Sequence, residues 1–324
     1  MRVLVAGASG FIGFHLVCRL KSDGYEVRAL ARQTSDTSAL DKLGVEVCKA
    51  DFSELKSLIS PCSGIDVAFN LIGRIGGWGV SESDLRLANV TTVKNLLEAC
   101  RDAGVAHFIH CSTPGVVGMS GVAPESLPYH PTGKYEQTKY EGEKVALGAQ
   151  ITGSIPVTIV RPDFVYGPGD LHKLKLFRAI RDGRFPLIGD GRSLLHPTYI
   201  EDVIDGMMLV ARNEAAFGQI FNLAGPEPVT VDRMVRVIAQ ELGIPAPRMR
   251  IPVTVAKSVA MLAEAGAIMT HSEPLLTKYQ VKFFTCDHAS DVSKARLALG
   301  YKPKVSIERG VELTIKWYKE QKLL

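Results

Sequence analysis

Short apolar runs alternate with amphipathic stretches through the first half of the chain. The apolar runs are typical of buried strands in a parallel sheet, and a helix-like stretch follows each of them. The predicted strands are residues 2–6, 25–31, 45–50, 65–72, 106–112 and 155–161, and the predicted helices are residues 11–22, 36–43, 53–60, 82–103 and 133–149. This alternation predicts an α/β fold with a doubly wound parallel sheet, in which ligands bind at the carboxyl ends of the strands.

A glycine-rich turn follows the first predicted strand. Residues 7–13 read GASGFIG, and a helix-like stretch runs on to Lys21. One glycine permits the tight turn, one lets the backbone approach a pyrophosphate, and one lets the helix pack close to the strand. The helix N-terminus then offers free N–H groups to the phosphates. We therefore predict a Rossmann-type dinucleotide site with cofactor contacts at Gly7, Ser9, Gly10, Phe11, Ile12 and Gly13.

The end of the second predicted strand favours NADP. The strand ends in Leu30-Ala31-Arg32, and no acidic residue follows until Asp36. An acidic residue at this point would bind the ribose 2′-OH of NAD, whereas an arginine suits the 2′-phosphate of NADP. We expect NADP, with Arg32 as a contact and NAD as the alternative. After the third strand, Asp51 and Phe52 are expected at the adenine, although Asp51 also suits a helix N-cap.

A proton-transfer site is predicted from Tyr135 and Lys139, which lie one turn apart on one face of a helix. A neighbouring ammonium lowers the pKa of a phenol, so we expect Tyr135 to exchange a proton with substrate near neutral pH. Lys139 is also expected to reach the ribose of the cofactor. The strand at 106–112 leads into Ser112 and Thr113, and a hydroxyl there can hold the substrate oxygen. We predict Thr113, Tyr135 and Lys139 as the catalytic set.

The pattern changes after Gly167, where helices and Pro/Gly breaks dominate. We predict a dinucleotide-binding domain from residues 1–167 and 198–229. A smaller, mostly helical C-terminal substrate domain is predicted from residues 168–197 and 230–324. The glycine-rich loop at 73–79 follows the fourth strand at the expected mouth of the substrate site. Trp78 in this loop is either a substrate contact or a packed anchor.

Composition narrows the function classes. The 324 residues are 46% hydrophobic, which suffices for the core of one large or two interlocked domains. The net charge of +4 comes from dispersed Lys and Arg, so no nucleic-acid partner is expected. The six cysteines form no CxxC pair, which is typical of reduced thiols in the cytoplasm. No signal peptide is expected, because the chain enters its first strand almost at once. No His/Cys/Asp cluster has metal-ligand spacing, so no metal site is predicted.

The apolar segment 251–269 is interrupted by Lys257 and Glu264, so it lacks the uncharged run of a membrane-spanning helix. Its polar residues fall on one side of a helical wheel and leave a broad apolar face. We expect this face to pack over the substrate domain. A lid over the substrate site and a helix on a membrane surface are the alternatives.

Six segments, in order along the chain, resemble the extended short-chain dehydrogenase/reductase family and its NAD(P)-dependent epimerase/dehydratase group. They are GASGFIG at 7–13, Ser112-Thr113, YEQTK at 135–139, RPDFVYGPGD at 161–170, YIEDV at 199–203 and FNLAG at 221–225. The resemblance implies Tyr135 as the acid/base, Lys139 as its partner and Thr113 as the Ser/Thr member. It also implies a homodimer built on helices 82–103 and 133–149. Further cofactor contacts implied by the resemblance are Leu71, Ile72, Gly73, Pro162 and Val165.

Departures from the nucleotide-sugar pattern bear on the substrate. Phe164 stands where many nucleotide-sugar enzymes have Asn, and Leu194 and Leu195 occupy the region where they place a phosphate-binding Arg. A missing guanidinium removes the bidentate phosphate contact that Arg supplies best. The segment 274–281 resembles the 3β-hydroxysteroid dehydrogenase branch. Phe164, Leu195 and Trp78 are therefore the predicted substrate contacts.

The sequence thus predicts an NAD(P)-dependent oxidoreductase that transfers a hydride between nicotinamide and a secondary alcohol or ketone. A steroid-like or other apolar ring alcohol is the favoured small-molecule substrate. A nucleotide-sugar epimerase or dehydratase is the alternative, and a non-catalytic NADP-binding protein is the second alternative. The intact set of Thr113, Tyr135 and Lys139 argues against the last.

Overall fold

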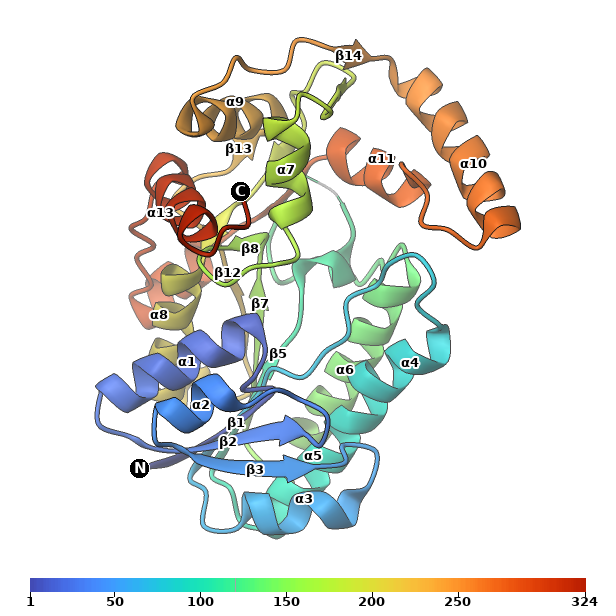
Figure 1. Ribbon diagram of the computed structural model, residues 1–324. Helices are drawn as coiled ribbons and strands as arrows, with labels where there is room; N and C mark the ends of the chain where they lie inside the picture. The colour runs from blue at the N-terminus through green and yellow to red at the C-terminus, as the bar shows by residue number, and fades with distance from the viewer. Residues whose placement is uncertain (120) are drawn as a thin grey trace.

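The central sheet has seven strands, and every neighbouring pair in it is parallel. The computed structural model describes residues 1–119 and 121–324 (Figure 1). The strand order is β12-β7-β5-β4-β1-β2-β3. The strands are β1 (Arg2–Ala6), β2 (Glu26–Arg32), β3 (Glu46–Ala50), β4 (Val67–Asn70), β5 (His107–Cys111), β7 (Val157–Pro162) and β12 (Ile220–Leu223). The predicted doubly wound α/β fold is confirmed, and the order reverses between β1 and β4.

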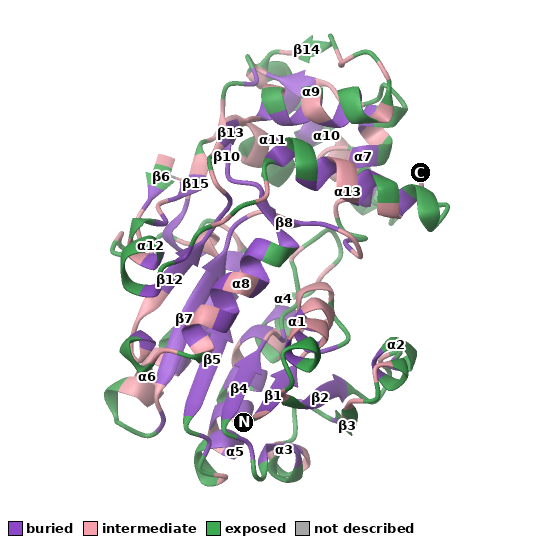
Figure 2. Ribbon diagram, turned by 90° about the vertical axis from the view of Figure 1, so that its left-hand side faces the viewer, coloured by how far each residue is buried: buried purple, intermediate pink, exposed green. Residues whose placement is uncertain are grey.

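Alternating side chains of the strands pack into two separate hydrophobic cores, one on each face of the sheet. Val3 and Val5 of β1 lie in one core, and Leu4 and Ala6 lie in the other. Helices α1 (Phe11–Ser22) and α8 (Ile200–Ala211) cover the first face, whereas α3 (Leu55–Cys62), α5 (Thr92–Asp102) and α6 (Lys134–Ile151) cover the second. In Figure 2 the inner strands β1, β4, β5 and β7 are buried along most of their length, whereas the edge strand β3 is mostly half-buried or exposed. Each fully buried Val or Leu contributes about 1.5–3 kcal/mol, so this double layer fixes the sheet that carries the site.

The predicted helix 82–103 is continuous but has a wider turn in its middle. It consists of α4 (Glu82–Arg86), a π-helical segment η1 (Leu87–Thr91) and α5. Single π-turns of this kind are frequent at functional sites. The remaining helices are α2 (Ser38–Lys42), α7 (Leu174–Arg181), α9 (Val231–Leu242), α10 (Val253–Thr270), α11 (Lys278–Thr285), α12 (Ser293–Leu299) and α13 (Ile307–Glu320), with 3-10 turns η2 (Pro114–Val117) and η3 (Glu214–Ala216).

The later part of the chain is mostly helical, as predicted, and lies at the upper end of the molecule in Figure 1. Four short strand pairs lie outside the seven-stranded sheet. They are β8 (Val165–Tyr166) with β11 (Thr198–Tyr199), β9 (Leu187–Ile188) with β14 (Arg250–Ile251), β10 (Leu194–Leu195) with β13 (Val229–Thr230), and β6 (Gly121–Ala123) with β15 (His288–Ser290). The boundaries between the two expected domains remain a prediction.

Helices α10 and α11 form a hairpin at the edge of this region, called the α10–α11 hairpin below. Its small core joins Ala256 and Ala260 of α10 to Val281 of α11 and Ile188 of β9. The large apolar side chains of α10, among them Leu262, stay exposed. The expected packing of a broad apolar face is therefore wrong, because the buried stripe is made of alanines. By length and composition α10 is able to cross a membrane, and 17% of it is buried.

Candidate active site

The glycine turn connects β1 to α1 at the edge where the strand order reverses. Gly7 has a φ of +85°, which a residue with a side chain adopts only with strain. A Cβ on Gly13 would lie 2.2 Å from the carbonyl oxygen of Gly7, so only glycine permits this packing. Gly10 is the N-cap of α1 and offers no side chain to the first N–H groups of the helix. The turn therefore fits a pyrophosphate held by backbone N–H groups.

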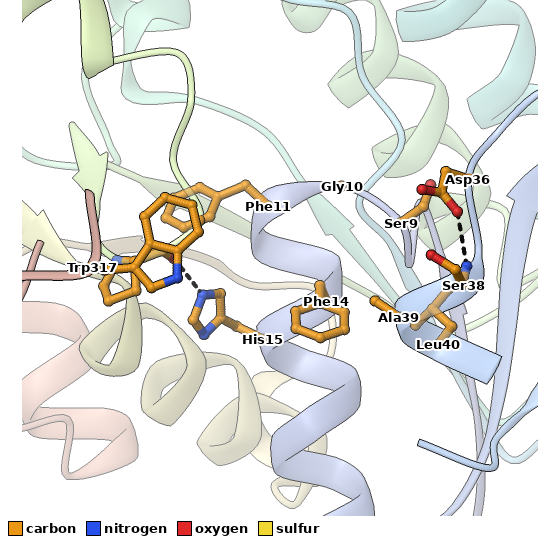
Figure 3. Close-up of a pocket in the computed structure, with 12 residues that line it drawn as sticks. Ser9, Gly10, Phe11, Phe14, His15, Asp36, Ser38, Ala39, Leu40 and Trp317 are labelled. Carbon is orange, nitrogen blue, oxygen red and sulfur yellow. Dashed lines mark hydrogen bonds between the residues drawn. The ribbon is translucent and has the colours of Figure 1, made fainter. Parts of the chain in front are cut away.

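A cavity of about 430 Å³ opens beside this turn, between α1, α2 and α13 (Figure 3). Ser9, Gly10 and Phe11, three of the predicted cofactor contacts, lie in its wall. The Nε2 atom of His15 lies 2.8 Å from the carbonyl oxygen of Pro168, which ties α1 to the segment after β8. The glycine turn is thus open to this cavity. The other lining residues are Phe14, Asp36, Ser38, Ala39, Leu40, Gly169 and Trp317.

The end of β4 runs directly against the glycine turn. A Cβ on Gly7 would lie 3.0 Å from the carbonyl carbon of Leu71, and 3.1 Å from the backbone nitrogen of Ile72. Gly73 continues this segment toward α6. A Cβ on Gly73 would lie 3.7 Å from Nζ of Lys139 in that helix. The structure therefore places Leu71, Ile72 and Gly73 between the glycine turn and Lys139, along one path.

The expected adenosine end lies at the tips of β2 and β3. Arg32 pairs in register with Ala50, is exposed, and has no ion-pair partner among residues 1–119 and 121–324. Asp51 accepts hydrogen bonds from the backbone nitrogen (2.9 Å) and Oγ (2.7 Å) of Ser53. Asp51 is not a helix N-cap, because α3 begins after Glu54. Phe52 is buried in the second core. Its contact with the adenine remains a prediction.

Thr113, Tyr135 and Lys139 come together above the end of β5. Thr113 follows the strand and caps η2, with its Oγ1 accepting from the backbone nitrogen of Gly115 (3.3 Å). Tyr135 and Lys139 lie in the first two turns of α6, and Nζ of Lys139 donates to the carbonyl oxygen of Cys111 (2.7 Å). A Cβ on Gly76 would lie 3.0 Å from Cβ of Tyr135. The loop at 73–79 therefore passes directly over the predicted acid/base.

Burial dominates the electrostatics of this group. It raises the pKa of the Tyr135 phenol above its usual value, and the nearby Cys111 and Glu136 add to that shift. A hydrogen bond from Thr113 partly offsets it. Burial also lowers the pKa of the Lys139 ammonium. The expected lowering of the Tyr135 pKa by Lys139 is therefore wrong for this structure. A protonated phenol in this place is suited to donate a proton.

Asn89 holds the loop and the helix in their relative positions. Its Oδ1 accepts from the backbone nitrogen of Arg74 (2.9 Å), and its Nδ2 donates to the carbonyl oxygen of Arg74 (3.1 Å) and to Oγ1 of Thr138 (2.9 Å). Asn89 lies in the wider turn of the π-helical segment η1. The wider turn thus supports the segment that covers Tyr135.

The three predicted substrate contacts differ in their burial and in the residues around them. Phe164 has a φ of +30°, stacks on Phe283 of α11 with ring centroids 5.9 Å apart, and carries Nζ of Lys173 over its ring at 4.7 Å. Leu195 is fully buried in the main core, so its side chain is not open to a substrate here. Trp78 is partly exposed, at 37%.

Two cofactor residues implied by the resemblance lie on either side of Phe164. Pro162 ends β7 and is buried, and Val165 is half-buried at the start of β8. Both therefore belong to the segment that leaves the sheet beside the predicted nicotinamide position. Their contact with a cofactor remains a prediction.

Sequence reasoning missed two residues of this site. Glu136 is buried directly beside Tyr135, and the hydroxyl of Tyr279 donates to its Oε1 (2.9 Å). The position of Glu136 inside the motif at 135–139 was a usable signal. Nothing in the sequence placed Tyr279 there, because it comes from α11, 143 residues along the chain.

Comparison with known proteins agrees with this geometry. The model of the NAD dependent epimerase/dehydratase family matches residues 3–224. The chain is 28% identical to a 2-alkyl-3-oxoalkanoate reductase of Stenotrophomonas maltophilia, over 96% of this chain and 97% of that protein. It is 30% identical to 3beta-hydroxysteroid-dehydrogenase/decarboxylase isoform 1 of Arabidopsis thaliana, over 84% of this chain and 66% of that protein.

Among solved structures, the UDP-glucuronic acid 4-epimerase from Bacillus cereus in complex with NAD superposes with a TM-score of 0.78. The two chains are 26% identical, and the match covers 99% of each. The matched proteins thus include reductases and dehydrogenases as well as an epimerase on the same fold.

Proposed function

The chain belongs to the NAD dependent epimerase/dehydratase family, within the extended short-chain dehydrogenases/reductases, and from this premise we propose that it is a reductase of apolar ketones. The neutral Tyr135 phenol gives its proton to the carbonyl oxygen, and Thr113 orients that oxygen. Lys139 lies beside Gly73, at the end of the segment that runs from the glycine turn past Leu71 and Ile72. The nicotinamide supplies the hydride when the cofactor is bound. In the reverse direction the same groups oxidise a secondary alcohol.

One observation carries this proposal. The glycine turn and the set of Thr113, Tyr135 and Lys139, of which Lys139 is buried and the other two are half-buried, are joined by one short segment, from Leu71 to Gly76, which lies against both. A dinucleotide along that segment would bring its reactive end beside Tyr135. General acid catalysis needs the proton donor within hydrogen-bond reach of the reacting oxygen, and a ketone bound beside Tyr135 would meet that condition.

Several features support an apolar substrate. The aromatic rings of Phe164 and Phe283 stack beside the catalytic region. Arg178 of α7 donates to the carbonyl oxygen of Leu323 and is therefore not free to bind a phosphate in this structure. The two relatives described above are named for a 2-alkyl-3-oxoalkanoate and a 3beta-hydroxysteroid. We therefore place the substrate among branched oxo acids and ring ketones.

We further propose NADP as the preferred cofactor, because the guanidinium of Arg32 is exposed and has no ion-pair partner in the part of the chain that the structure describes. Arg32→Ala should weaken NADP binding about tenfold or more, because a charge-assisted phosphate contact is lost, and should leave NAD binding unchanged. Titration of both cofactors by calorimetry measures this. Arg192→Ala, which removes an arginine 86% exposed, is the matched control. An equal loss of NAD affinity would assign Arg32 to another role.

A nucleotide-sugar epimerase or dehydratase is the second candidate, and the fold shared with UDP-glucuronic acid 4-epimerase favours it. The test is the thermal stability of the NADP-loaded protein with UDP, GDP or dTDP. A ligand that binds the folded state at 100 times its Kd adds about 2.7 kcal/mol to the free energy of unfolding. A clear rise with one nucleotide would replace the ketone-reductase proposal. No rise, with stabilisation by NADP itself, supports it.

We also propose a cytoplasmic homodimer that uses the helical layer of η1, α5 and α6. Leu87 in η1 is 46% exposed, an apolar side chain that a partner helix would cover. The molar mass in solution distinguishes a dimer from a monomer.

A further inference from the structure

Helix α10 carries an uncovered apolar stripe on its outer side. Its members are spaced by one or two helical turns, which places them on one side of the helix. They are Val255, Val259, Leu262 and Met269, with exposed fractions from 48% to 84%. The alanine stripe that joins α10 to α11 is a different one. Figure 1 shows α10 along the outer edge of the molecule, and no element among the described residues covers the apolar stripe.

The exposed apolar surface extends beyond that stripe. Met261 and Ile268, two turns apart, are exposed on another side of α10, and Leu275 in the connection to α11 is fully exposed. Lys257 and Glu264 are the only ionisable residues of α10. A partner helix or strand would cover one side of α10, whereas a lipid phase covers every side that faces away from the protein. Apolar exposure on more than one side therefore favours lipid over a protein partner.

The acidic residues of the hairpin are already paired within the protein. Glu264 lies 3.6 Å from Nζ of Lys278 in α11, and its Oε1 accepts from the backbone nitrogen of Lys278 (2.8 Å). Glu273, in the connection between the two helices, pairs with Lys175 of α7 at 2.9 Å. These are the two acidic residues between positions 253 and 285. The hairpin therefore has no unbalanced carboxylate that would repel an anionic surface.

Two lysines beside the apolar surface have no ion-pair partner in the part of the chain that the structure describes. They are Lys257 and Lys282, and both are exposed. Lys257 lies two turns before Glu264, on the same side of α10. Lys282 lies one turn after Lys278, which is the partner of Glu264. Both ammonium groups thus lie along one flank of the apolar surface, where they would meet anionic headgroups.

We propose that the α10–α11 hairpin binds the surface of an anionic lipid bilayer. The outer apolar side chains of α10 enter the boundary between headgroups and acyl chains, and Lys257 and Lys282 contact the anionic headgroups. The helix lies along the surface rather than across the bilayer, because its alanine stripe stays packed on α11. Burial of apolar area attracts the hairpin to any bilayer, and the lysines select negatively charged lipid.

A second copy of this chain fits the same surface less well. Self-association through α10 about a twofold axis would set the same residues of two chains against each other. The two unpaired lysines of one copy would then come near those of the other, with both acids of each hairpin already in ion pairs. Like charges at close range repel. A bilayer that contains anionic lipid offers the opposite charge instead.

The hairpin also borders the candidate active site. The hydroxyl of Tyr279 in α11 donates to Oε1 of Glu136, the residue after Tyr135 (2.9 Å). Phe283 of the same helix stacks on Phe164. A bilayer bound at α10 would therefore lie one helix away from the place where an apolar ketone reacts. This consequence rests on the proposed function, whereas lipid binding itself does not.

The test is sedimentation of the whole protein with lipid vesicles, in the absence of substrate and cofactor. Vesicles of equal parts phosphatidylcholine and phosphatidylglycerol are compared with vesicles of phosphatidylcholine alone. We expect the native protein to bind the mixed vesicles, and to bind the neutral vesicles more weakly. Higher ionic strength should weaken binding to the mixed vesicles, because salt screens the attraction between the lysines and the headgroups.

Leu262→Gln combined with Met269→Gln tests the apolar contact without adding charge. This variant should bind the mixed vesicles about tenfold more weakly or less, because two apolar side chains no longer enter the acyl-chain boundary. The matched control is Ile151→Gln combined with Leu297→Gln, at two apolar residues that are 84% and 88% exposed outside the hairpin. The control should bind like the native protein.

Lys257→Gln combined with Lys282→Gln tests the charge. Binding to the mixed vesicles should fall about tenfold, because each lysine near an anionic surface adds to the attraction. Binding to the neutral vesicles should stay unchanged. Lys302→Gln combined with Lys316→Gln removes two exposed lysines outside the hairpin, and it should have a smaller effect on binding to the mixed vesicles.

Failure of the native protein to sediment with the mixed vesicles overturns the inference, as does native-like binding by the variant with Leu262→Gln and Met269→Gln. A native dimer that this variant dissociates, seen in the molar mass in solution, would also overturn it, because the apolar stripe would then bind a second copy of this chain. Each of these results leaves the proposed hydride transfer intact. Failure of the proposed function would show itself separately, as undiminished turnover in Tyr135→Phe.

Discussion

Asp163 is a buried carboxyl group whose protonation should make the stability of the protein depend on pH. It is 4% exposed, and its Oδ2 accepts a hydrogen bond from Oγ of Ser290 (2.6 Å). Burial raises its pKa from 3.8 to about 7. Below the pKa that Asp163 has in the unfolded chain, the carboxyl is neutral in both states and its full contribution to stability is present. Between these two values the unfolded chain releases a proton that the folded chain keeps, so the free energy of unfolding falls as pH rises.

Asp163→Asn should therefore flatten the pH dependence between about pH 4 and 7, a change on the order of a few kcal/mol. The asparagine keeps an acceptor for Ser290. Urea unfolding across this pH range measures the effect. Asp291→Asn is the control, because hydrogen bonds from Ser293 lower the pKa of Asp291 and move its contribution below this range. An unchanged slope in Asp163→Asn would show that Asp163 does not titrate in that window.

At the same scale, the sequence identified the reacting residues but not their surroundings. Thr113, Tyr135 and Lys139 were predicted from residue type and helical spacing, and the structure brings them together. The spacing could not reveal that burial raises the pKa of Tyr135. Burial depends on the loop at 73–79 and on α11, which are far from α6 in the chain.

At the scale of elements, the junction of β1 and α1 depends on the absence of a side chain at Gly13. Gly13→Ala would place a methyl group 2.2 Å from the carbonyl oxygen of Gly7. We expect a lower Tm and loss of stabilisation by NADP, both measured by thermal unfolding with and without the cofactor.

Gly148→Ala is the matched control, because Gly148 also lies inside a helix, and an added Cβ there meets nothing within 4 Å. It should be neutral or stabilise by about 0.5–1 kcal/mol, since alanine is the better helix former. If Gly13→Ala behaves like Gly148→Ala, then the close packing at the turn is not required.

Most elements of the sheet layer were predictable, because periodicity and turn residues mark parallel strands and their crossover helices. β1 and α1 match their predicted ranges, and β2, β3, β4, β5 and β7 differ from theirs at the ends by a few residues, whereas no range was predicted for β12. β6 and β15 were not predicted, because a three-residue pair between Gly121–Ala123 and His288–Ser290 has no local signal. The alanine stripe of α10 was not predicted either, because it packs against Val281 of another helix, and the sequence does not show that contact.

At the scale of the whole molecule, the site forms where strand ends and the later helices meet. The glycine turn, the loop at 73–79 and the segments after β5 and β7 all leave the same edge of the sheet. The sequence could predict this convergence, because carboxyl ends of parallel strands share one edge. It could not predict which later helix would close the site. The structure assigns that place to α11, through Tyr279 and Phe283.

The most direct test of the account compares native protein and Tyr135→Phe for oxidation of NADPH by a panel of ketones that includes a 2-alkyl-3-oxo acid and a 3-oxosteroid. The native protein should reduce at least one ketone. Tyr135→Phe should lose about a hundredfold or more in turnover, as expected when a general acid is removed, and should bind NADP unchanged. Full turnover by Tyr135→Phe, or no reduction of any ketone by the native protein, would contradict the proposed function.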